Sequence, residues 1–186
     1  MRVIAGEFRS RRLQSMPGDE VRPTSDRLRE TLFNILGALV EGAVFVDAYA
    51  GTGAVGIEAL SRGERKAVFI EKNRKAANLI QTNLAALGIE NRARVIVGPA
   101  PLYLGGLSAD IVFLDPPYPK EHEYRAALEA LGAAMPGLVV VQHSKRFEPA
   151  NEYGALRRTR AVKQSDNVLS FFKPTESASQ PEEAAE

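Results

Sequence analysis

Cysteine is absent from the 186 residues of this chain, and histidine occurs only twice, as His122 and His143. The lack of thiols excludes disulfide bonds, thiolate zinc sites and cysteine nucleophiles. With only two histidines, a histidine-rich metal site is not expected, and we predict no bound metal. Neither histidine is supported by a serine or second-histidine motif, so we expect His122 to be a surface residue and not a catalytic base.

Long apolar runs are also missing. The first ten residues, MRVIAGEFRS, lack the apolar core of a secretory signal peptide. No stretch approaches the ~18 consecutive apolar residues that cross a membrane. We therefore expect a soluble, cytoplasmic protein without a membrane partner. A hydrophobic content of 45% in a chain of this length is sufficient for one main core.

Positive and negative charges almost balance, giving a net charge of +1. The balance depends on residues 175–186 (TESASQPEEAAE), which hold four glutamates and no lysine or arginine. Without these four, 19 of the 23 acidic residues remain against 24 basic ones, a net charge of +5. We predict a disordered acidic tail over 175–186. The mildly basic remainder is compatible with nucleic acid without requiring it.

The most informative stretch is VFVDAYAGTGAVG at residues 44–56. The short apolar run over 44–48, with Asp47 as its single acid, indicates a strand buried on both faces. IEALSRG at 57–63 suits a short helix after the turn. Three glycines lie between them with G-x-G-x-x-G spacing: Gly51, Gly53 and Gly56. Strand, glycine turn and helix form the first unit of a nucleotide-binding α/β fold.

Acidic residues help to select the ligand, because the glycine spacing alone fits NAD, FAD or S-adenosylmethionine (AdoMet), or only a tight turn. A carboxylate at Asp47 would repel a pyrophosphate and suit the ammonium and sulfonium groups of AdoMet. Alternatively, Asp47 caps the turn through backbone hydrogen bonds. Glu71 ends a predicted strand over 66–71 and can accept both hydroxyls of an adenosine ribose.

The rest of the chain alternates helices and strands. We predict helices over 73–87 and 121–131, strands over 93–97, 109–114 and 138–142, and an antiparallel pair over 155–163 and 168–172. The loop Gly98-Pro99-Ala100, after the third strand, can hold an adenine edge.

The strand over 109–114 runs directly into Asp115-Pro116-Pro117-Tyr118. Two prolines remove two N–H donors and force a rigid, extended loop. Asp115 and the carbonyl of Pro116 can accept the two hydrogens of an exocyclic amino group, and Tyr118 can stack on a planar base. The alternative is a proline turn that ends a strand, with Tyr118 used for packing.

Arginines concentrate ahead of the glycine motif. Residues 1–15 predict a short hairpin or extended arm, and residues 21–40 predict an amphipathic helix capped by Thr24 or Ser25. These arginines either bind anions such as phosphate or only keep an edge and a helix start solvated. They are Arg2, Arg9, Arg11, Arg12, Arg22, Arg27 and Arg29.

Three segments, taken in order, resemble class I AdoMet-dependent methyltransferases of the amino-methylating D/N-PP-Y type. They are VFVDAYAGTGAVGIEALSRG, IEKN and IVFLDPPY. The upstream segments GEFRSRRL and RPTSDRLRETLFNIL narrow the resemblance, over about 2–172, to the bacterial RsmD family, which methylates the N2 amine of one guanine in 16S ribosomal RNA. It implies a Rossmann-like α/β fold with a seven-stranded, mostly parallel sheet, one reversed strand and helices on both faces. A basic N-terminal hairpin and helix extension (1–40) would touch RNA, ahead of a methyltransferase domain (41–174).

The resemblance also implies which residues form the site. AdoMet would contact Asp47, Ala50, Gly51, Thr52, Gly53, Glu71, Lys72, Pro99, Ala100 and Asp115. The target base would lie on Asp115, Pro116, Pro117 and Tyr118, and RNA phosphates on Arg9, Arg11, Arg12, Arg22 and Arg27. Tyr49 and Thr52 stand where phenylalanine and serine are usual. Pro99 stands where an acid is usual, so adenine recognition would rest on other groups, such as the backbone of Ala100.

The sequence therefore predicts an AdoMet-dependent monomer that methylates 16S ribosomal RNA, free or in a small-subunit particle. Three alternatives stay open. In the first, the substrate amine belongs to another nucleic acid or to a protein. The glycines and Glu71 would also fit an NAD oxidoreductase, and the fold would fit a non-catalytic RNA-binding protein.

Overall fold

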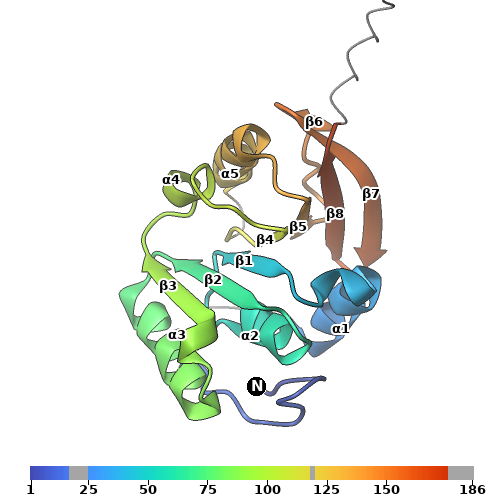
Figure 1. The fold of residues 1–186 in the computed structure, drawn as a ribbon. Helices are drawn as coiled ribbons and strands as arrows, with labels where there is room; N and C mark the ends of the chain where they lie inside the picture. The colour runs from blue at the N-terminus through green and yellow to red at the C-terminus, as the bar shows by residue number, and fades with distance from the viewer. Residues whose placement is uncertain (17–24, 118–119, 176–186) are drawn as a thin grey trace, which may run out of the picture.

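The structure is a computed structural model and describes residues 1–16, 25–117 and 120–175. An eight-stranded sheet with the strand order β3-β2-β1-β4-β5-β8-β7-β6 runs through the molecule (Figure 1). The strands are β1 (Val44–Ala48), β2 (Lys66–Glu71), β3 (Ala93–Val97), β4 (Ile111–Leu114), β5 (Leu138–Ser144), β6 (Glu152–Tyr153), β7 (Leu156–Gln164) and β8 (Asn167–Pro174). β1 to β5 pair in parallel, as expected for the implied Rossmann-like fold.

The strand count differs from the expected seven, because β6 adds a strand of two residues at the edge. Glu152 pairs with Arg157 and Tyr153 with Leu156, so β6 runs antiparallel to β7. β8 is antiparallel to both β5 and β7. Two strands, β6 and β8, therefore run against the rest, where one was predicted. A two-residue strand carries no alternating pattern that a sequence could reveal.

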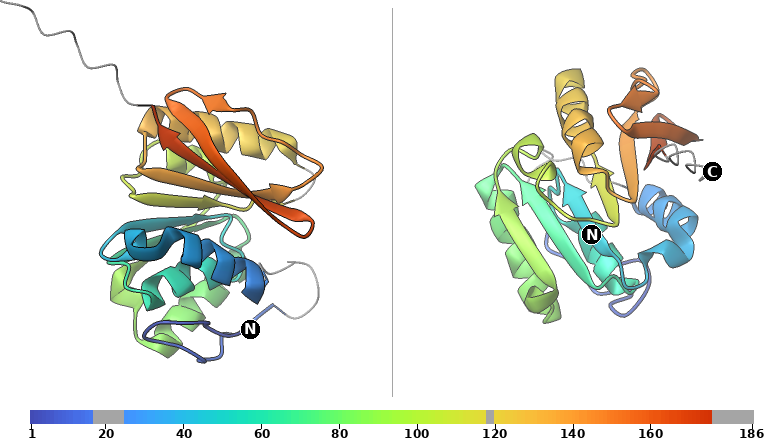
Figure 2. Two further views of the ribbon diagram at one scale, coloured as in Figure 1. Left: turned by 90° about the vertical axis from the view of Figure 1, so that its right-hand side faces the viewer. Right: turned by 45° about the horizontal axis from the view of Figure 1, so that its top comes forward.

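Helices cover both faces of the sheet (Figure 1, Figure 2). They are α1 (Asp26–Leu36), α2 (Ala54–Ser61), α3 (Arg74–Leu87), α4 (Pro101–Leu104) and α5 (Glu121–Ala134), with 3₁₀ turns η1 (Gly37–Val40) and η2 (Glu90–Arg92). Alternate residues of a strand point to opposite faces. Phe45 of β1 packs towards α1 and α2, whereas Val46 packs towards α4 and α5. Asp47 therefore lies on the α2 face.

The arm formed by residues 1–14 packs on α2 and α3 through the buried side chains of Val3 and Leu13. It turns back as predicted, but with an isolated bridge between Arg2 and Arg12 in place of two regular strands. Glu58 of α2 holds the arm, since its carboxylate accepts hydrogen bonds from the amides of Ile4 (2.8 Å) and Ala5 (3.0 Å).

The helix predicted over 21–40 is α1 followed by the turn η1. Ser25 is its N-cap, as predicted, and its hydroxyl accepts a hydrogen bond from the amide of Leu28 at 3.2 Å. Thr24, the other predicted cap, lies outside the described residues. Among the helices of the described ranges, none has both the length and the apolar character that a membrane span needs.

Candidate active site

The candidate site lies where three neighbouring parallel strands end. Ala48 of β1 is in register with Ile70 of β2 and with Leu114 of β4. The glycine turn, Glu71 and Asp115 follow these positions, so all three reach the same edge of the sheet. Figure 1 shows the three strands β2, β1 and β4 in this order. The carboxyl edge of a parallel sheet is where α/β proteins bind their ligands.

The glycine turn is sharp, and three of its residues adopt the left-handed backbone conformation. The φ angles are 65° at Tyr49, 55° at Gly51 and 77° at Gly53. A Cβ on Gly53 would also lie 3.0 Å from the side chain of Ile80. Glycine at this position therefore permits both the turn and close packing of α3. Ala50 and Thr52, two further predicted cofactor contacts, lie in the same turn and are buried.

Asp47 is buried, with 2% of its surface exposed, and its Oδ2 accepts a hydrogen bond from the amide of Gly56 at 2.8 Å. Gly56 is the third residue of α2, whose N-cap, Gly53, has no side chain. Asp47 therefore supplies the missing cap, which is the capping alternative raised by the sequence. This bond also accounts for α2 beginning at Ala54, three residues earlier than predicted. Burial, and then the charges of Asp115 and Glu71, hold the pKa of Asp47 well above its usual range.

Glu71, the predicted ribose acceptor, is tied to the glycine turn. Its Oε2 accepts a hydrogen bond from the amide of Gly51 at 2.8 Å, and its Oε1 from the amide of Asn73 at 2.7 Å. Each carboxylate oxygen can accept a second hydrogen bond, so ribose hydroxyls still find acceptors. Lys72 is exposed beside it. Three carboxylates, Asp47, Glu71 and Asp115, thus gather at the turn, and this negative edge fits a cationic cofactor better than a pyrophosphate.

The predicted adenine loop is held by the amide of Gly98, which donates to the carbonyl of Glu71 at 3.1 Å. Ala100 is buried, and Pro99 brings no side-chain acceptor. Tyr103 was not predicted to belong to this site. Its ring packs on Gly98, since a Cβ added to Gly98 would lie 2.7 Å from Cε2 of Tyr103. Tyr103 is 37% exposed, which leaves an aromatic surface at the end of β3. Its spacing from the loop carried no signal for this contact.

The loop after β4 begins with the half-buried Asp115 and the buried Pro116, and Pro117 is exposed. Tyr118, the predicted stacking residue, lies outside the described residues. A second tyrosine contacts this loop: the hydroxyl of Tyr124 lies 3.2 Å from the carbonyl of Pro116 and 3.2 Å from that of Gln142, so its single hydrogen is shared between the two acceptors. Tyr124 was not predicted to contact this loop. The sequence shows only that an aromatic residue lies in the first turn of the next helix.

Tyr49 links the glycine turn to the same helix. Its hydroxyl donates to Oε2 of Glu123 at 3.0 Å and lies 3.4 Å from the Glu123 carbonyl. Burial and this hydrogen bond to a carboxylate raise the pKa of Tyr49 above its usual range. The phenylalanine that is usual at this position has no hydroxyl and could not make this contact. Glu123 directly precedes Tyr124 in α5.

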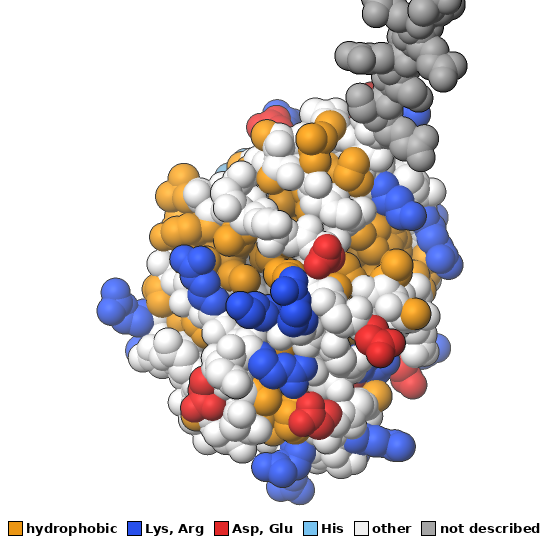
Figure 3. Space-filling view, in the orientation of Figure 1, with side chains coloured by type: hydrophobic (Ala, Val, Ile, Leu, Met, Phe, Trp, Pro, Cys, Tyr) orange, Lys and Arg blue, Asp and Glu red, His pale blue; other side chains and the backbone are white. Residues whose placement is uncertain are grey.

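The predicted RNA-contacting arginines that the structure describes, Arg9, Arg11, Arg12 and Arg27, do not form one cluster. Arg9 and Arg11 lie near the tip of the arm, where the backbone amide of Glu7 donates to the carbonyl of Ser61 and the Arg11 guanidinium donates to that of Ala86. α2 and α3 end there, at the edge opposite the candidate site. Arg12 and Arg27 are exposed, and Arg22 lies outside the described residues. On the face drawn in Figure 3, basic side chains form a loose group near the middle, with others around the rim.

Arg27 lies nearer to the candidate site than the arm tip does. Its backbone carbonyl accepts a hydrogen bond from the side chain of Gln164 at 3.4 Å. Gln164 ends β7, which runs in the same direction as β5, so Arg27 lies at the carboxyl edge of the sheet.

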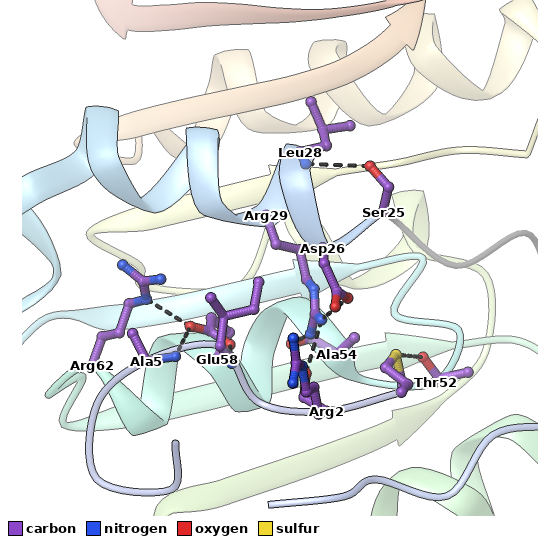
Figure 4. A network of polar contacts seen from close by, with 12 residues as sticks. Arg2, Ala5, Ser25, Asp26, Leu28, Arg29, Thr52, Ala54, Glu58 and Arg62 are labelled. Atoms are coloured by element: carbon purple, nitrogen blue, oxygen red, sulfur yellow. Dashed lines mark hydrogen bonds and ion pairs between the residues drawn. The ribbon is translucent and has the colours of Figure 1, made fainter. Parts of the chain in front are cut away.

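The structure contradicts both roles considered for Arg29, anion binding and a solvated helix start, because its side chain is buried. It is 0% exposed, and its guanidinium donates to the carbonyls of Arg2 (2.9 Å) and Ala54 (3.3 Å) and to Asp26 (2.7 Å). Figure 4 shows these contacts between α1, the arm and the start of α2. Arg29 therefore joins three segments of the fold.

Comparison with known proteins gives matches along most of the chain. The family model described as conserved hypothetical protein 95 matches residues 1–173. "Putative rRNA methyltransferase YlbH" of Bacillus subtilis (strain 168) is 34% identical over 169 residues, 86% of this chain and 91% of that protein. Ribosomal RNA small subunit methyltransferase D of Escherichia coli (strain K12) is 42% identical over 120 residues, which span 63% of this chain and 60% of that protein.

Among solved structures, "Putative methyltransferase yhhF" from Escherichia coli superposes with a TM-score of 0.82 at 29% identity. The superposition covers 94% of this chain and 97% of that one. It agrees with a Rossmann-like class I methyltransferase fold. With a family match over 1–173 and both motifs at one edge of such a sheet, the chain belongs to the RsmD family, described as conserved hypothetical protein 95.

Proposed function

We propose that this protein transfers the methyl group of AdoMet to the exocyclic N2 amine of a guanine in small-subunit (16S) ribosomal RNA. The observation that carries the proposal is the register of β1 with β4, in which Ala48 lies opposite Leu114. This register brings the glycine turn, the proposed cofactor site, beside the Asp115 loop, the proposed acceptor site for an amine. The name of the Escherichia coli relative, a small-subunit ribosomal RNA methyltransferase, supports the substrate.

The residues at the glycine turn fit AdoMet, because carboxylates gather there and none of the turn side chains is basic. Asp47 and the turn Ala50-Gly51-Thr52-Gly53 would hold the methionine part, and Glu71 and Lys72 the ribose. The adenine would rest on the loop of Pro99 and Ala100, with the ring of Tyr103 nearby. When bound, AdoMet supplies a sulfonium methyl whose transfer breaks an S–C bond, forms an N–C bond and leaves S-adenosylhomocysteine.

The loop after β4 would hold the acceptor. Asp115 and the Pro116 carbonyl would accept the two N2 hydrogens, favour a pyramidal nitrogen and direct its lone pair. Because these groups are fixed before reaction, catalysis would come from positioning and electrostatics. Asp115 could also take the proton that the amine loses. The guanine must leave its stack, at a cost of about a few kcal/mol, and Tyr118 would hold it by stacking.

We further propose that residues 1–40 form an RNA-contacting extension of the catalytic domain over 41–174. Arg9, Arg11, Arg12, Arg22 and Arg27 would contact RNA phosphates along this extension. The substrate would be ribosomal RNA or a small-subunit particle, and the protein would act as a cytoplasmic monomer. The acidic segment 175–186 lies outside the described residues apart from Thr175.

The test is transfer of labelled methyl from AdoMet to small-subunit RNA and to small subunits from cells that lack this protein, followed by nucleoside analysis. Labelled N2-methylguanosine at one position is the expected product. Label on adenine or on a protein would agree with the proposed site but contradict the proposed substrate. The protein would then be an amino-methyltransferase of another nucleic acid or of a protein. If the protein does not bind AdoMet, the proposed cofactor is wrong, and the loss of the usual acid at Pro99 would be the first explanation to test.

A further inference from the structure

We propose that the first turn of α5 aligns the amine-binding loop with the cofactor turn, and that Tyr124 is the positioning residue for the Pro116 carbonyl. This inference rests on the proposed function, because the direction of that carbonyl matters only if it accepts a hydrogen from the target amine. Tyr124 and its neighbour Glu123 belong to neither motif.

Tyr124 anchors a loop that cannot anchor itself through its amides. Pro116 and Pro117 have no N–H, so this part of the loop can be fixed only through its carbonyls or side chains. The Tyr124 hydroxyl lies between the carbonyls of Pro116 and Gln142, 3.2 Å from each, and shares its one hydrogen between them. Gln142 belongs to the buried strand β5. The hydroxyl therefore ties the loop to the rigid centre of the sheet.

The same hydroxyl sets the direction in which the Pro116 carbonyl can accept a second hydrogen bond. A carbonyl oxygen has two lone pairs, and the bond from Tyr124 uses one of them. The other would then be available to an N2 hydrogen of the base. Tyr124 can hold this orientation because it is 1% exposed and its ring packs on Phe147 with centroids 4.8 Å apart.

Glu123 makes the corresponding contact on the cofactor side. It accepts a hydrogen bond from the Tyr49 hydroxyl at 3.0 Å, and Tyr49 is held at a φ of 65° immediately before the glycines. Neighbouring residues of one helical turn thus contact the segment after β1 and the segment after β4. Because methyl transfer depends on the separation and angle of two reacting atoms, this shared support would set the reaction geometry.

Tyr124→Phe tests the role directly, since it removes the hydroxyl and keeps the ring. We expect the single-turnover rate of methyl transfer to fall about tenfold, whereas the Kd for AdoMet and the KM for RNA stay within about twofold. Tyr49→Phe should lower the same rate by about threefold. Tyr153→Phe is the matched control, because its hydroxyl accepts a hydrogen bond from the Ala150 amide near the sheet edge, and its rate should not change.

Thermal unfolding and AdoMet calorimetry separate positioning from a structural role. A lower Tm for Tyr124→Phe with an unchanged rate would overturn the inference and leave the proposed function intact. A loss of rate that is matched by an equal loss of AdoMet affinity would also overturn it. If the unaltered protein transfers no methyl to the RNA or to the particle, the proposed function fails, and the positioning role fails with it.

Discussion

The carboxylate of Glu71 accepts the amide hydrogen of Gly51 at 2.8 Å, although these residues come from different strand ends. An acid expected to bind a ribose therefore also fixes the turn that precedes α2. Substitution of Glu71 should consequently affect the cofactor site in two ways, through lost hydroxyl contacts and through a looser turn.

Glu71→Ala should weaken AdoMet binding by at least about tenfold, or about 1.4 kcal/mol, because it removes both acceptors and frees two backbone amides. Glu71→Gln keeps one carbonyl oxygen and should weaken binding less. Calorimetric titration with AdoMet measures both variants. The exposed Glu90 of η2 provides the control, and Glu90→Gln should bind as the unaltered protein does. Equal affinities for Glu71→Ala and Glu90→Gln would contradict a role in the site.

Asp115→Ala should lower the rate of methyl transfer at least about 100-fold, whereas the affinity for AdoMet is largely kept. The reason is that Asp115 is proposed to hold the amine, while the residues proposed to hold most of the cofactor lie at the ends of β1, β2 and β3. Asp115→Asn keeps one acceptor, and the motif tolerates asparagine, so it should retain part of the rate. Rates come from transfer of labelled methyl to RNA, with calorimetry beside them. Unchanged turnover of Asp115→Ala would eliminate this role.

Glu64 should make the stability of the protein depend on pH. Its side chain is buried, and within the described part of the chain neither carboxylate oxygen has a hydrogen-bond partner. Burial, and then the charge of Asp110, raise its pKa to about 8. The folded state thus binds this proton more tightly than the unfolded state, whose glutamate titrates near 4.3. Its contribution to stability is complete below pH ~4.3 and is lost as pH rises to about 8.

Glu64→Gln removes this ionisation and keeps the size of the side chain. Relative to the unaltered protein, the variant should gain about 4 kcal/mol of unfolding free energy as the pH rises from 5 to 9, as pKa values of about 8 in the folded state and 4.3 in the unfolded state imply. Urea unfolding at several pH values measures the difference. Glu90→Gln, on the surface, should show no such trend. A constant difference between Glu64→Gln and the unaltered protein across this range would contradict a buried, titrating Glu64.

Gly56→Ala should destabilise the protein although Gly56 lies within the helix α2. In an open helix this change would add about 1 kcal/mol of stability. Here a new Cβ would lie 2.3 Å from Cε1 of Phe69, a ring in the centre of β2, so the helix or the ring must move. We expect a loss of about 1–3 kcal/mol. Gly106→Ala, where the nearest atom would be 3.9 Å away, is the control and should be nearly neutral in thermal unfolding.

Local patterns were sufficient to predict most of the sheet. The structure has β1, β2 and β3 at the predicted residues, 44–48, 66–71 and 93–97, because buried parallel strands appear as short apolar runs between turn residues. The cap at Ser25 was likewise predicted, since capping depends on residues three apart. The two motifs were predicted to form one site, and the strand register confirms that both reach one edge of the sheet.

The remaining features depend on contacts between distant segments. Arg29 is a charged residue near the start of a helix in the sequence, and its burial depends on contacts with the arm at Arg2 and with α2 at Ala54. Glu71 reaches Gly51, and Tyr124 reaches Pro116, through the pairing of strands and not through their spacing. Nothing in the sequence pattern of α2 indicates a role for Glu58, yet its carboxylate accepts hydrogen bonds from two amides of the arm.

The arm brings the first residue of the chain back to the cofactor turn. The Thr52 hydroxyl lies 3.7 Å from the sulfur of Met1, and Figure 4 draws this contact at Thr52. The Met1 carbonyl accepts a hydrogen bond from the Leu13 amide. An affinity tag fused ahead of Met1 would therefore emerge against the glycine turn and compete for space with the ligand being measured. β8 ends at the opposite edge of the sheet, so a tag attached directly after the described residues at that end would begin away from the glycine turn.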